Sequence, residues 1–232
     1  YPYLGLLDPI QVDADSGRWF RVQDDARMQG HWACVYGLQE WGGISPIRLQ
    51  TWRDFDSEVS EKVRFDLLGI DYLISWKMDP ITREDVVIPA ETLYHGLAPY
   101  GDAKVYRLPG IAQRAWITER VETVSTDDAL WDYLAMEDFD PHRTAVLVGD
   151  EPSSHSGGTG MVSVISDRPG LVELSVQTER PALLVLSEAW YPGWVAYTDA
   201  GRKPVDRVSG FVQGVQLETS GQEQRVVFEY RP

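Results

Sequence analysis

Cysteine is nearly absent from this sequence, with a single Cys34 among 232 residues. This excludes an internal disulfide and a zinc site built from cysteines. Cys34 lies between Ala33 and Val35, a setting typical of a small buried hydrophobe. A nucleophilic thiolate would need a polar cleft and a base, and the sequence offers only His31 nearby. We therefore expect Cys34 to be buried and structural.

Positive charge is also scarce. Lysine and arginine total 21 against 36 acidic residues, which gives a formal net charge of −15. The basic residues do not cluster, and even the pair Arg202-Lys203 has Asp199 and Asp206 beside it. A chain with this charge repels phosphate backbones and anionic lipid headgroups at long range. The sequence thus disfavours nucleic acid as a partner, and it disfavours tight peripheral binding to acidic membranes.

Long hydrophobic runs are missing too, because no segment approaches the roughly 18 to 20 apolar residues of a membrane span. The sequence begins with Tyr1 and shows neither an initiator methionine nor a signal peptide. We therefore interpret it as a fragment or a processed product of a longer protein. Its hydrophobic fraction of 43%, with nine tryptophans and eleven tyrosines, is ample for a folded core. Extensive disorder is not expected.

Patterns typical of catalysis or metal binding are lacking as well. The four histidines are scattered, without the spacing of metal ligands. The acids Asp54, Asp56 and Glu58 lie at the expected start of a helix, where capping and solvation explain them. The glycine-rich segment 151–160 lacks the Gly-Lys-Ser/Thr of a phosphate-binding loop. The sequence therefore predicts no catalytic residue, no metal and no cofactor.

In the first part of the chain, apolar residues recur with helical periods in some segments and with strand-like periods in others. Apolar residues recur about once per helical turn from Val59 to Leu67, and Gly69 follows where a helix C′ residue belongs. Ser125 or Thr126 can cap a second helix that has two aspartates in its first turn. We expect helices at 57–68 and from 126 or 127 to 136, and strands at 18–22, 71–76, 86–88, 105–108, 115–118 and 144–148.

The second part is typical of an all-β domain. The polar, glycine-rich segment 151–160 predicts a linker, and from Met161 onward the apolar period becomes 2. Strands are expected at 161–166, 171–178, 182–188, 194–198, 204–208, 211–217 and 225–230. The predicted fold class is α+β: a mixed-sheet α/β domain over 1–150, followed by an antiparallel β-sandwich of immunoglobulin-like or jelly-roll-like type over 161–232.

Several stretches, in the same order along the chain, resemble those of a known family. They are Tyr36-Gly37-Leu38, Leu67-Leu68-Gly69-Ile70-Asp71-Tyr72-Leu73-Ile74-Ser75, Val105-Tyr106-Arg107-Leu108-Pro109 with Arg114-Ala115, Trp190-Tyr191-Pro192-Gly193-Trp194, Phe211-Val212-Gln213-Gly214-Val215 and Val227-Phe228-Glu229-Tyr230-Arg231-Pro232. On these residues the chain resembles the soluble, extracytoplasmic C-terminal region of the YfhO-like bacterial membrane proteins. Those proteins in turn resemble multi-spanning, lipid-phosphosugar-dependent glycosyltransferases.

The resemblance implies a non-catalytic accessory role on the extracytoplasmic face of the cell membrane. The catalytic acids of such a protein would belong to its membrane-embedded part, which is absent from this chain. The expected partners are that transmembrane part and an envelope glycan or polyprenyl-linked sugar. Two alternatives stay open, a stand-alone carbohydrate-binding module and a structural interaction module that packs on membrane helices. An unrecognised hydrolase is a further alternative that no motif supports.

The aromatic residues of the Pro-Gly-Trp motif allow two interpretations. Proline and glycine set a sharp backbone turn that can direct Trp194 into the core of a sandwich. Alternatively, Trp190, Tyr191 and Trp194 form a platform that stacks on sugar rings. The first interpretation is the more common in a small β domain, where most large aromatics are buried. The three residues are the candidate sugar contacts of this chain.

Overall fold

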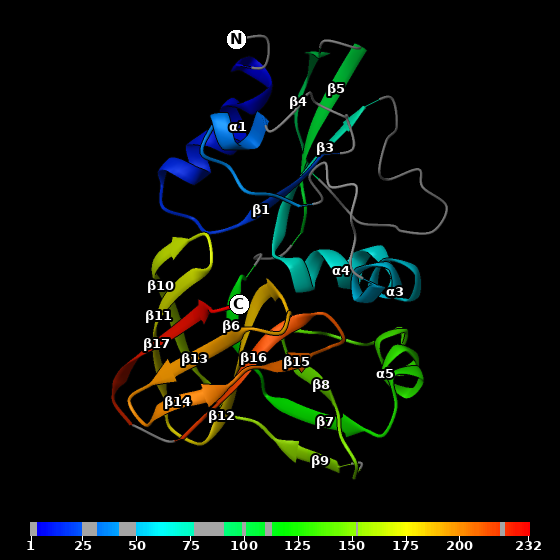
Figure 1. The fold of residues 1–232 in the computed structure, drawn as a ribbon. Coiled ribbons are helices and arrows are strands. Elements are labelled where there is room, and N and C mark those ends of the chain that lie inside the picture. Colours follow the sequence, from blue (N-terminus) through cyan, green and yellow to red (C-terminus); the bar gives the residue numbers. More distant parts are fainter. Residues whose placement is uncertain are drawn as a thin grey trace. The chain divides into compact units, whose positions relative to one another are not determined.

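The computed structural model describes residues 4–24, 32–41, 50–76, 91–98, 101–109, 113–151, 153–218 and 221–232. The chain divides into two units (Figure 1). Unit 1 comprises Tyr1–Arg48 and Leu68–Gln113, and unit 2 comprises Leu49–Leu67 and Arg114–Pro232. The strand expected at 86–88 lies outside the described residues.

Unit 1 is built on a mixed sheet, as the sequence predicts. Its strands are β1 (Arg21–Asp24), β2 (Glu40–Trp41), β3 (Ile70–Trp76), β4 (Glu91–Ala98) and β5 (Gly101–Arg107), in the order β2-β1-β3-β5-β4. The β1 strand pairs in parallel with β2 and β3, whereas β5 pairs antiparallel with β3 and β4. Leu7 and Ile10 of helix α1 (Leu4–Asp15) and Trp32 of helix α2 (Trp32–Val35) share a core cluster with Val22 and Ile74 of the sheet.

Two expectations for unit 1 need correction. The strand expected at 18–22 begins only at Arg21, where pairing with Ile70 of β3 starts. Arg18 precedes the strand and forms ion pairs with Asp13 and Asp71. Cys34 is exposed rather than buried. The short helix α2 directs Trp32 and Ala33 into the core, so the next residue along the helix faces away from it.

The helix expected at 57–68 is two helices in the structure. Helix α3 (Gln50–Glu58) ends before Val59, and α4 (Glu61–Leu68) begins after Ser60. Val59 is buried, and the Ser60 hydroxyl accepts a hydrogen bond from the Val63 amide at 3.4 Å. The chain therefore breaks at a serine that caps the new helix. The predicted Gly69 terminus is confirmed, because Gly69 has a φ of 64°.

The C-terminal part of unit 2 is a β-sandwich of two antiparallel sheets, as expected. One sheet has the order β10-β11-β17-β13-β14, and the other β15-β16-β12-β6. Alternate residues of β11 are buried, among them Val172 and Leu174, which pair with Phe228 and Val226 of β17. The strands are β6 (Ala115–Ile117), β10 (Gly160–Arg168), β11 (Leu171–Thr178), β12 (Ala182–Ala189), β13 (Trp194–Thr198), β14 (Gly201–Pro204), β15 (Asp206–Val208), β16 (Val212–Leu217) and β17 (Glu223–Tyr230).

A third layer covers the outer face of the β15-β16-β12-β6 sheet. It consists of parallel strands β7 (Arg120–Val124) and β8 (Thr144–Val148), the antiparallel strand β9 (Ser153–Ser156) and helix α5 (Asp127–Leu134). The Ser209 amide after β15 donates to the Val146 carbonyl of β8 at 2.7 Å. Phe55 of α3 stacks on Phe211 with ring centroids 4.6 Å apart. Thr126 caps α5 by accepting from the Ala129 amide, which confirms the predicted start of that helix.

The division into units differs from the expected domains. Because β6 pairs with β12, the segment after Gln113 belongs to unit 2 and the boundary does not fall at 151–160. The expected linker instead contains β9, which pairs with β7. A side chain at Gly157 would meet the Thr118 carbonyl, and one at Gly160 would meet the Gln177 carbonyl. These glycines therefore serve close backbone packing rather than flexibility.

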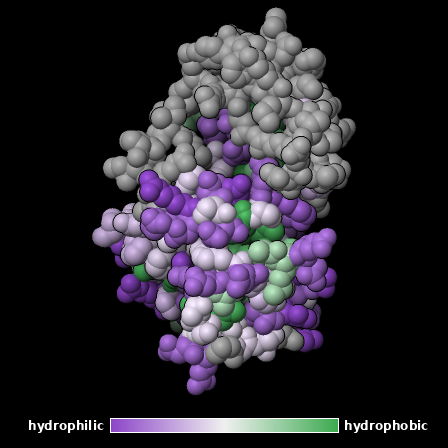
Figure 2. Space-filling view, turned by 90° about the vertical axis from the view of Figure 1, so that its right-hand side faces the viewer, coloured by the Kyte–Doolittle hydropathy of each residue, from purple (hydrophilic) through white to green (hydrophobic). Residues whose placement is uncertain are grey.

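The surface of the described residues is mainly hydrophilic on the face that Figure 2 presents, where purple side chains surround a small group of green ones. This agrees with the high charge of the chain. The exposed aliphatic residues of unit 2 include Met161, Val164 and Ile165 of the edge strand β10.

Gly210 tests the packing between the sandwich and the third layer. Its φ is 76°, and a Cβ atom there would overlap the ring of Trp131 on α5. We expect Gly210→Ala to lower the free energy of unfolding by about 3 kcal/mol, because positive-φ strain and overpacking add. Gly201→Ala is the matched control, since Gly201 also has a positive φ but nothing lies within 4 Å; about 1 kcal/mol is expected there. Chemical denaturation measures both, and equal losses would contradict the packing described.

Candidate functional site

The candidate sugar contacts lie at one end of the sandwich. Trp190 and Tyr191 follow β12, and Trp194 begins β13, where it pairs directly with Tyr230 at the end of β17. Trp194 and Tyr230 therefore share a face with their strand neighbours Ala196 and Phe228, which are buried in the core. The aromatic residues thus lie at the rim of the sandwich interior.

Trp190 has a structural role in this arrangement. Its indole Nε1 donates to the Val205 carbonyl at 2.9 Å, and its amide donates to the Phe211 carbonyl at 2.7 Å. These bonds fix the chain between β12 and β13 against β15 and β16. For Trp190 the geometry favours the interpretation that places the residue in the framework of the sandwich.

Tyr191, Trp194 and Tyr230 form a group that we call the aromatic cluster. The Tyr230 ring lies 6.4 Å from that of Tyr191 and 5.6 Å from that of Trp194, measured between centroids, and the ring planes are tilted. Tyr191 is 44% exposed, and the other two are half-buried. The cluster thus has a buried side that fixes it and an open side that is accessible to a ligand.

Gly193 makes the close approach of these rings possible. Its φ is 108°, and a Cβ atom would come within 3.0 Å of Tyr230 Cε2. The Gly193 carbonyl accepts from the Arg231 amide at 2.7 Å. The turn therefore holds the end of β17 against the start of β13. Tyr230 is not among the residues predicted from the sequence as sugar contacts, although it alternates with Val226 and Phe228. Its pairing with Trp194 is a long-range contact that local patterns do not predict.

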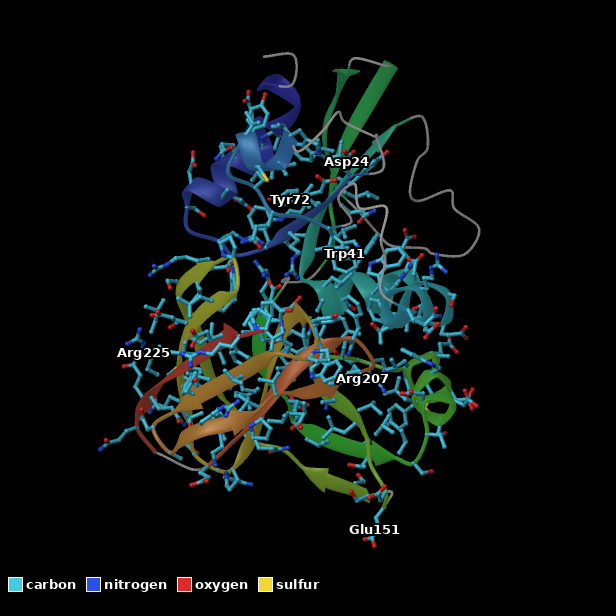
Figure 3. The ribbon with its side chains drawn as sticks, in the orientation of Figure 1. Asp24, Trp41, Tyr72, Glu151, Arg207 and Arg225 are labelled. Atoms are coloured by element: carbon cyan, nitrogen blue, oxygen red, sulfur yellow. The ribbon has the colours of Figure 1, made fainter. Side chains whose placement is uncertain are left out.

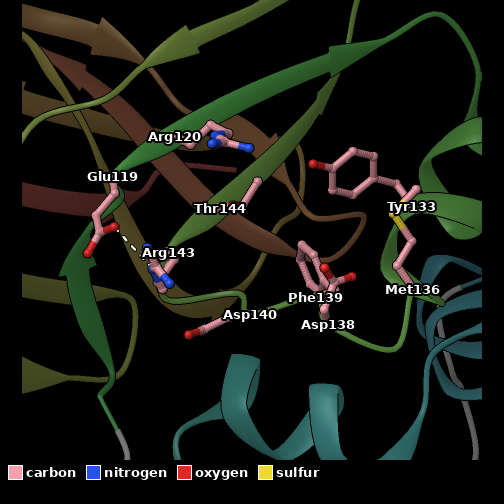
Figure 4. A pocket seen from close by; sticks show the side chains of 9 residues that line it. All are labelled: Glu119, Arg120, Tyr133, Met136, Asp138, Phe139, Asp140, Arg143 and Thr144. Atoms are coloured by element: carbon pink, nitrogen blue, oxygen red, sulfur yellow. Dashed lines mark hydrogen bonds and ion pairs between the residues drawn. The ribbon is translucent and has the colours of Figure 1, made fainter.

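A polar pocket lies elsewhere in unit 2, beside the first residues of β7 and β8 (Figure 4). Its volume is about 340 Å³. Arg120 begins β7, and Tyr133 belongs to α5. Asp138, Phe139 and Arg143 belong to the connection from α5 to β8, and Arg143 directly precedes β8. No local motif in the sequence marks these residues as a site.

The side chains of the pocket are held by neighbouring groups. Arg143 Nε lies 3.1 Å from Glu119 Oε2, and Arg120 Nε lies 3.9 Å from Glu122 Oε1. The Tyr133 ring meets Phe139 edge to face, with centroids 5.9 Å apart. In Figure 4 the Tyr133 hydroxyl points toward Arg120. Burial raises the pKa of this hydroxyl.

A buried ion-pair group joins three strands of the sandwich. The Arg114 side chain has no exposed surface and contacts Asp167 of β10 at 3.1 Å and Glu188 of β12. Ala115, the next residue, begins β6. Removing one partner from such a buried group costs about 3–5 kcal/mol. Arg114 therefore has a structural role, and it is one of the residues on which the family resemblance rests.

Unit 1 contains a second charged network around Tyr72. The Tyr72 hydroxyl donates to Asp13, which also pairs with Arg18 and lies 3.6 Å from Arg107. The hydrogen bond from Tyr72 and the nearby arginines lower the pKa of Asp13. Burial raises the pKa of Tyr72. The arrangement ties α1 to β3 and β5 and satisfies its charges internally.

Two acidic residues belong to neighbouring parallel strands. Asp24 ends β1 (Figure 3), and Glu40 begins β2. Asp24 accepts a hydrogen bond from Trp32 Nε1 at 3.0 Å. Burial, with a smaller effect of the Asp24 charge, raises the pKa of Glu40 to about 7. Among the residues that the structure describes, no three His, Cys, Asp or Glu side chains are grouped so that they could hold a metal ion.

Comparisons with known proteins give one weak likeness. The chain matches no protein-family model and no curated protein. Among solved structures it is similar to the cryo-EM structure of the arabinofuranosyltransferase AftD from mycobacteria, with 14% sequence identity and a TM-score of 0.27. The match covers 56% of this chain and spans only 8% of that chain. Within the described ranges, no helix is long and apolar enough to cross a membrane.

Glu40 gives a pH dependence of stability. Its pKa of about 7 in the folded state exceeds the ordinary value of 4.5, so the protonated carboxyl stabilises the fold. This contribution is fully present below pH 4.5 and is lost as the pH rises through about 7. Glu40→Gln should be more stable than the wild type at pH 8, by about 1 kcal/mol after allowance for partial exposure. The difference should shrink toward pH 5.

Chemical denaturation of both proteins at the two pH values measures this difference. The exposed carboxylate Asp8 provides the control Asp8→Asn. A constant difference between Glu40→Gln and the wild type across the pH range would contradict the environment described for Glu40.

Proposed function

We propose that this chain is a non-catalytic accessory region of a larger membrane protein of the glycosyltransferase type, and that it contacts a glycan. The observation that carries the proposal is the aromatic cluster, in which Tyr191, Trp194 and Tyr230 present half-exposed rings at the rim of a sandwich. The sequence resemblance to the YfhO-like proteins supports the membrane-associated context.

Physical chemistry supports a sugar as the ligand of the cluster. Aromatic faces attract the polarised C–H groups of a sugar ring, while tyrosine and tryptophan keep a polar atom for hydrogen bonding. Their rigid side chains lose little conformational entropy on binding. The Gly193 turn and the Trp194–Tyr230 pairing preorganise the rings, which lowers the cost of association.

In this proposal the chemistry belongs to the membrane-embedded part of the parent protein. That part and the glycan, either an envelope polymer or a polyprenyl-linked sugar, are the partners of this chain. The region lies on the extracytoplasmic face of the membrane. The net charge of −15 supports contact with the sugar portion of such a ligand rather than with its phosphates.

A structural interaction module is the second candidate. The edge strand β10 has exposed aliphatic residues at Met161 and Ile165, with exposed fractions of 71% and 54%. An edge strand with such residues is a template for association with another chain or for packing on membrane helices. This candidate predicts a partner on β10 and no role for the aromatic cluster.

Replacement of Tyr191 tests glycan binding by the cluster. Tyr191→Ala should weaken binding to envelope polysaccharides by about twofold to tenfold, because stacking interactions of aromatic rings contribute about 0.5–1.5 kcal/mol beyond buried area. Affinity electrophoresis and glycan arrays provide the measurement. Tyr197→Ala is the matched control, since Tyr197 alternates with Trp194 and Ala196 and faces the other side of β13. Equal losses in both variants, or glycan binding by neither wild type nor variants, would contradict the proposal.

The exposed thiol of Cys34 reports the side of the membrane. In spheroplasts that express the full-length parent, a membrane-impermeant maleimide should label Cys34, because an exposed cysteine is accessible to the reagent. The Cys34→Ser variant identifies any label on other cysteines. Labelling of Cys34 that appears only after lysis would place this region in the cytoplasm and overturn the proposed location.

A further inference from the structure

The polar pocket of unit 2 is a preorganised site, and the connection between α5 and β8 holds its shape. The Phe139 amide donates to the Met136 carbonyl at 3.1 Å, and the Thr144 amide donates to the Asp140 carbonyl at 2.9 Å. Trp116 Nε1 of β6 donates to the Pro141 carbonyl at 3.1 Å. Because these bonds fix both ends and the middle of the connection, a ligand would meet walls that are already in place.

The floor of the pocket is aromatic and its walls are polar. Phe139 is only 7% exposed and supports the Tyr133 ring edge to face. Around these rings lie the guanidinium groups of Arg120 and Arg143 and the carboxylate of Asp138 (Figure 4). Arginine donates several hydrogen bonds in a fixed geometry, and a carboxylate accepts several. The donors and acceptors match the hydroxyl groups of a sugar, and the aromatic rings match its C–H face.

The charges of the pocket exclude an anion as the preferred ligand. Two arginines and three carboxylates line it, and each arginine already faces a glutamate. The surrounding chain is strongly acidic. A phosphate or carboxylate would meet net negative charge and would have to compete with the existing ion pairs. A neutral polyhydroxyl ligand is not repelled by this negative charge and can bond to the groups without breaking the ion pairs.

The size of the pocket further restricts the ligands that can bind there. Its volume of about 340 Å³ lies at the small end of the range of about 300–1,000 Å³ for small-molecule sites. This space suits one sugar residue or a short chain end rather than a long polymer. The pocket belongs to the third layer, whereas the aromatic cluster lies on β13 and β17 and the turn before them.

We propose that the pocket between β7, β8 and α5 binds a neutral sugar residue. The rings of Tyr133 and Phe139 lie beneath the sugar ring, and Arg120, Arg143, Asp138 and the Tyr133 hydroxyl bond its hydroxyl groups. This site is separate from the aromatic cluster and does not depend on glycan binding there. Unit 2 then recognises carbohydrate at two places.

The test is a titration of the ¹⁵N-labelled full chain with neutral hexoses and pentoses, namely glucose, galactose, mannose, xylose and arabinose, at millimolar concentrations. Inorganic phosphate and acetate serve as anionic probes. At least one neutral sugar should cause saturable shifts of the amides of Arg120, Tyr133 and Arg143. Tyr133→Phe and Asp138→Asn should each weaken this binding about tenfold, because the first removes a hydroxyl group and the second removes the charge of a strong acceptor.

Matched controls separate the pocket from the rest of the molecule. Asp132→Asn makes the same change on an exposed residue of α5 that does not line the pocket, and it should leave the affinity unchanged. Tyr191→Phe is the corresponding control in the aromatic cluster, and it too should leave the affinity of the pocket unchanged. Melting temperatures of all variants should match the wild type, since no backbone contact is removed.

Several outcomes would overturn the inference. Saturation by phosphate or acetate but by no sugar would show an anion site, and no saturable shift with any probe would show a surface hollow without a ligand. Sugar binding that survives Asp138→Asn and Tyr133→Phe but is lost in Tyr191→Ala would support the cluster alone. If the pocket variants lose sugar binding and Tyr191→Ala keeps it, the result would support the pocket even if the aromatic cluster binds no glycan.

Discussion

The fold of unit 2 depends on the burial of β12. Every residue from Ala182 to Ser187 is buried, so this strand is covered on both faces of its sheet. It pairs with β16 on one side and with β6 on the other. One face forms the interior of the sandwich, and the other supports the layer of β7, β8 and α5. The pocket belongs to that layer, whereas the aromatic cluster lies on β13 and β17 of the other sheet of the sandwich. The buried β12 sheet therefore lies between the two candidate binding regions and gives both a rigid support.

Charge in this protein is used to define the structure rather than to attract a partner. Arg114 is fully buried and pairs with carboxylates from β10 and β12, and Asp13 serves a similar role beside Tyr72 and Arg18 in unit 1. Buried ionic groups add little net stability, but an alternative packing that separates them is strongly disfavoured. They therefore select one arrangement of strands, while the acidic surface keeps the chain soluble and discourages contact with phosphates.

Local patterns predicted the elements of this fold well. The alternation in β11 and β17 and the cap of α5 by Thr126 were readable because each depends on neighbours in the sequence. The boundary between the units could not be predicted from local patterns, since the pairing of β6 with β12 joins residues about 70 positions apart. The same reason hid Tyr230 from the candidate site and hid the pocket, whose residues come from two strand starts, a helix and a connection.

The glycines at 157, 158 and 160 have a practical consequence. Their composition marks the segment as the natural place to insert an affinity tag, a fluorescent domain or a protease site. The structure places them where backbones nearly touch, with Thr118, Ala182 and Gln177 directly opposite. An insertion there would force apart strands from different sheets, whereas the open turn at Gly201, with no atom nearby, has the free space that grafting requires.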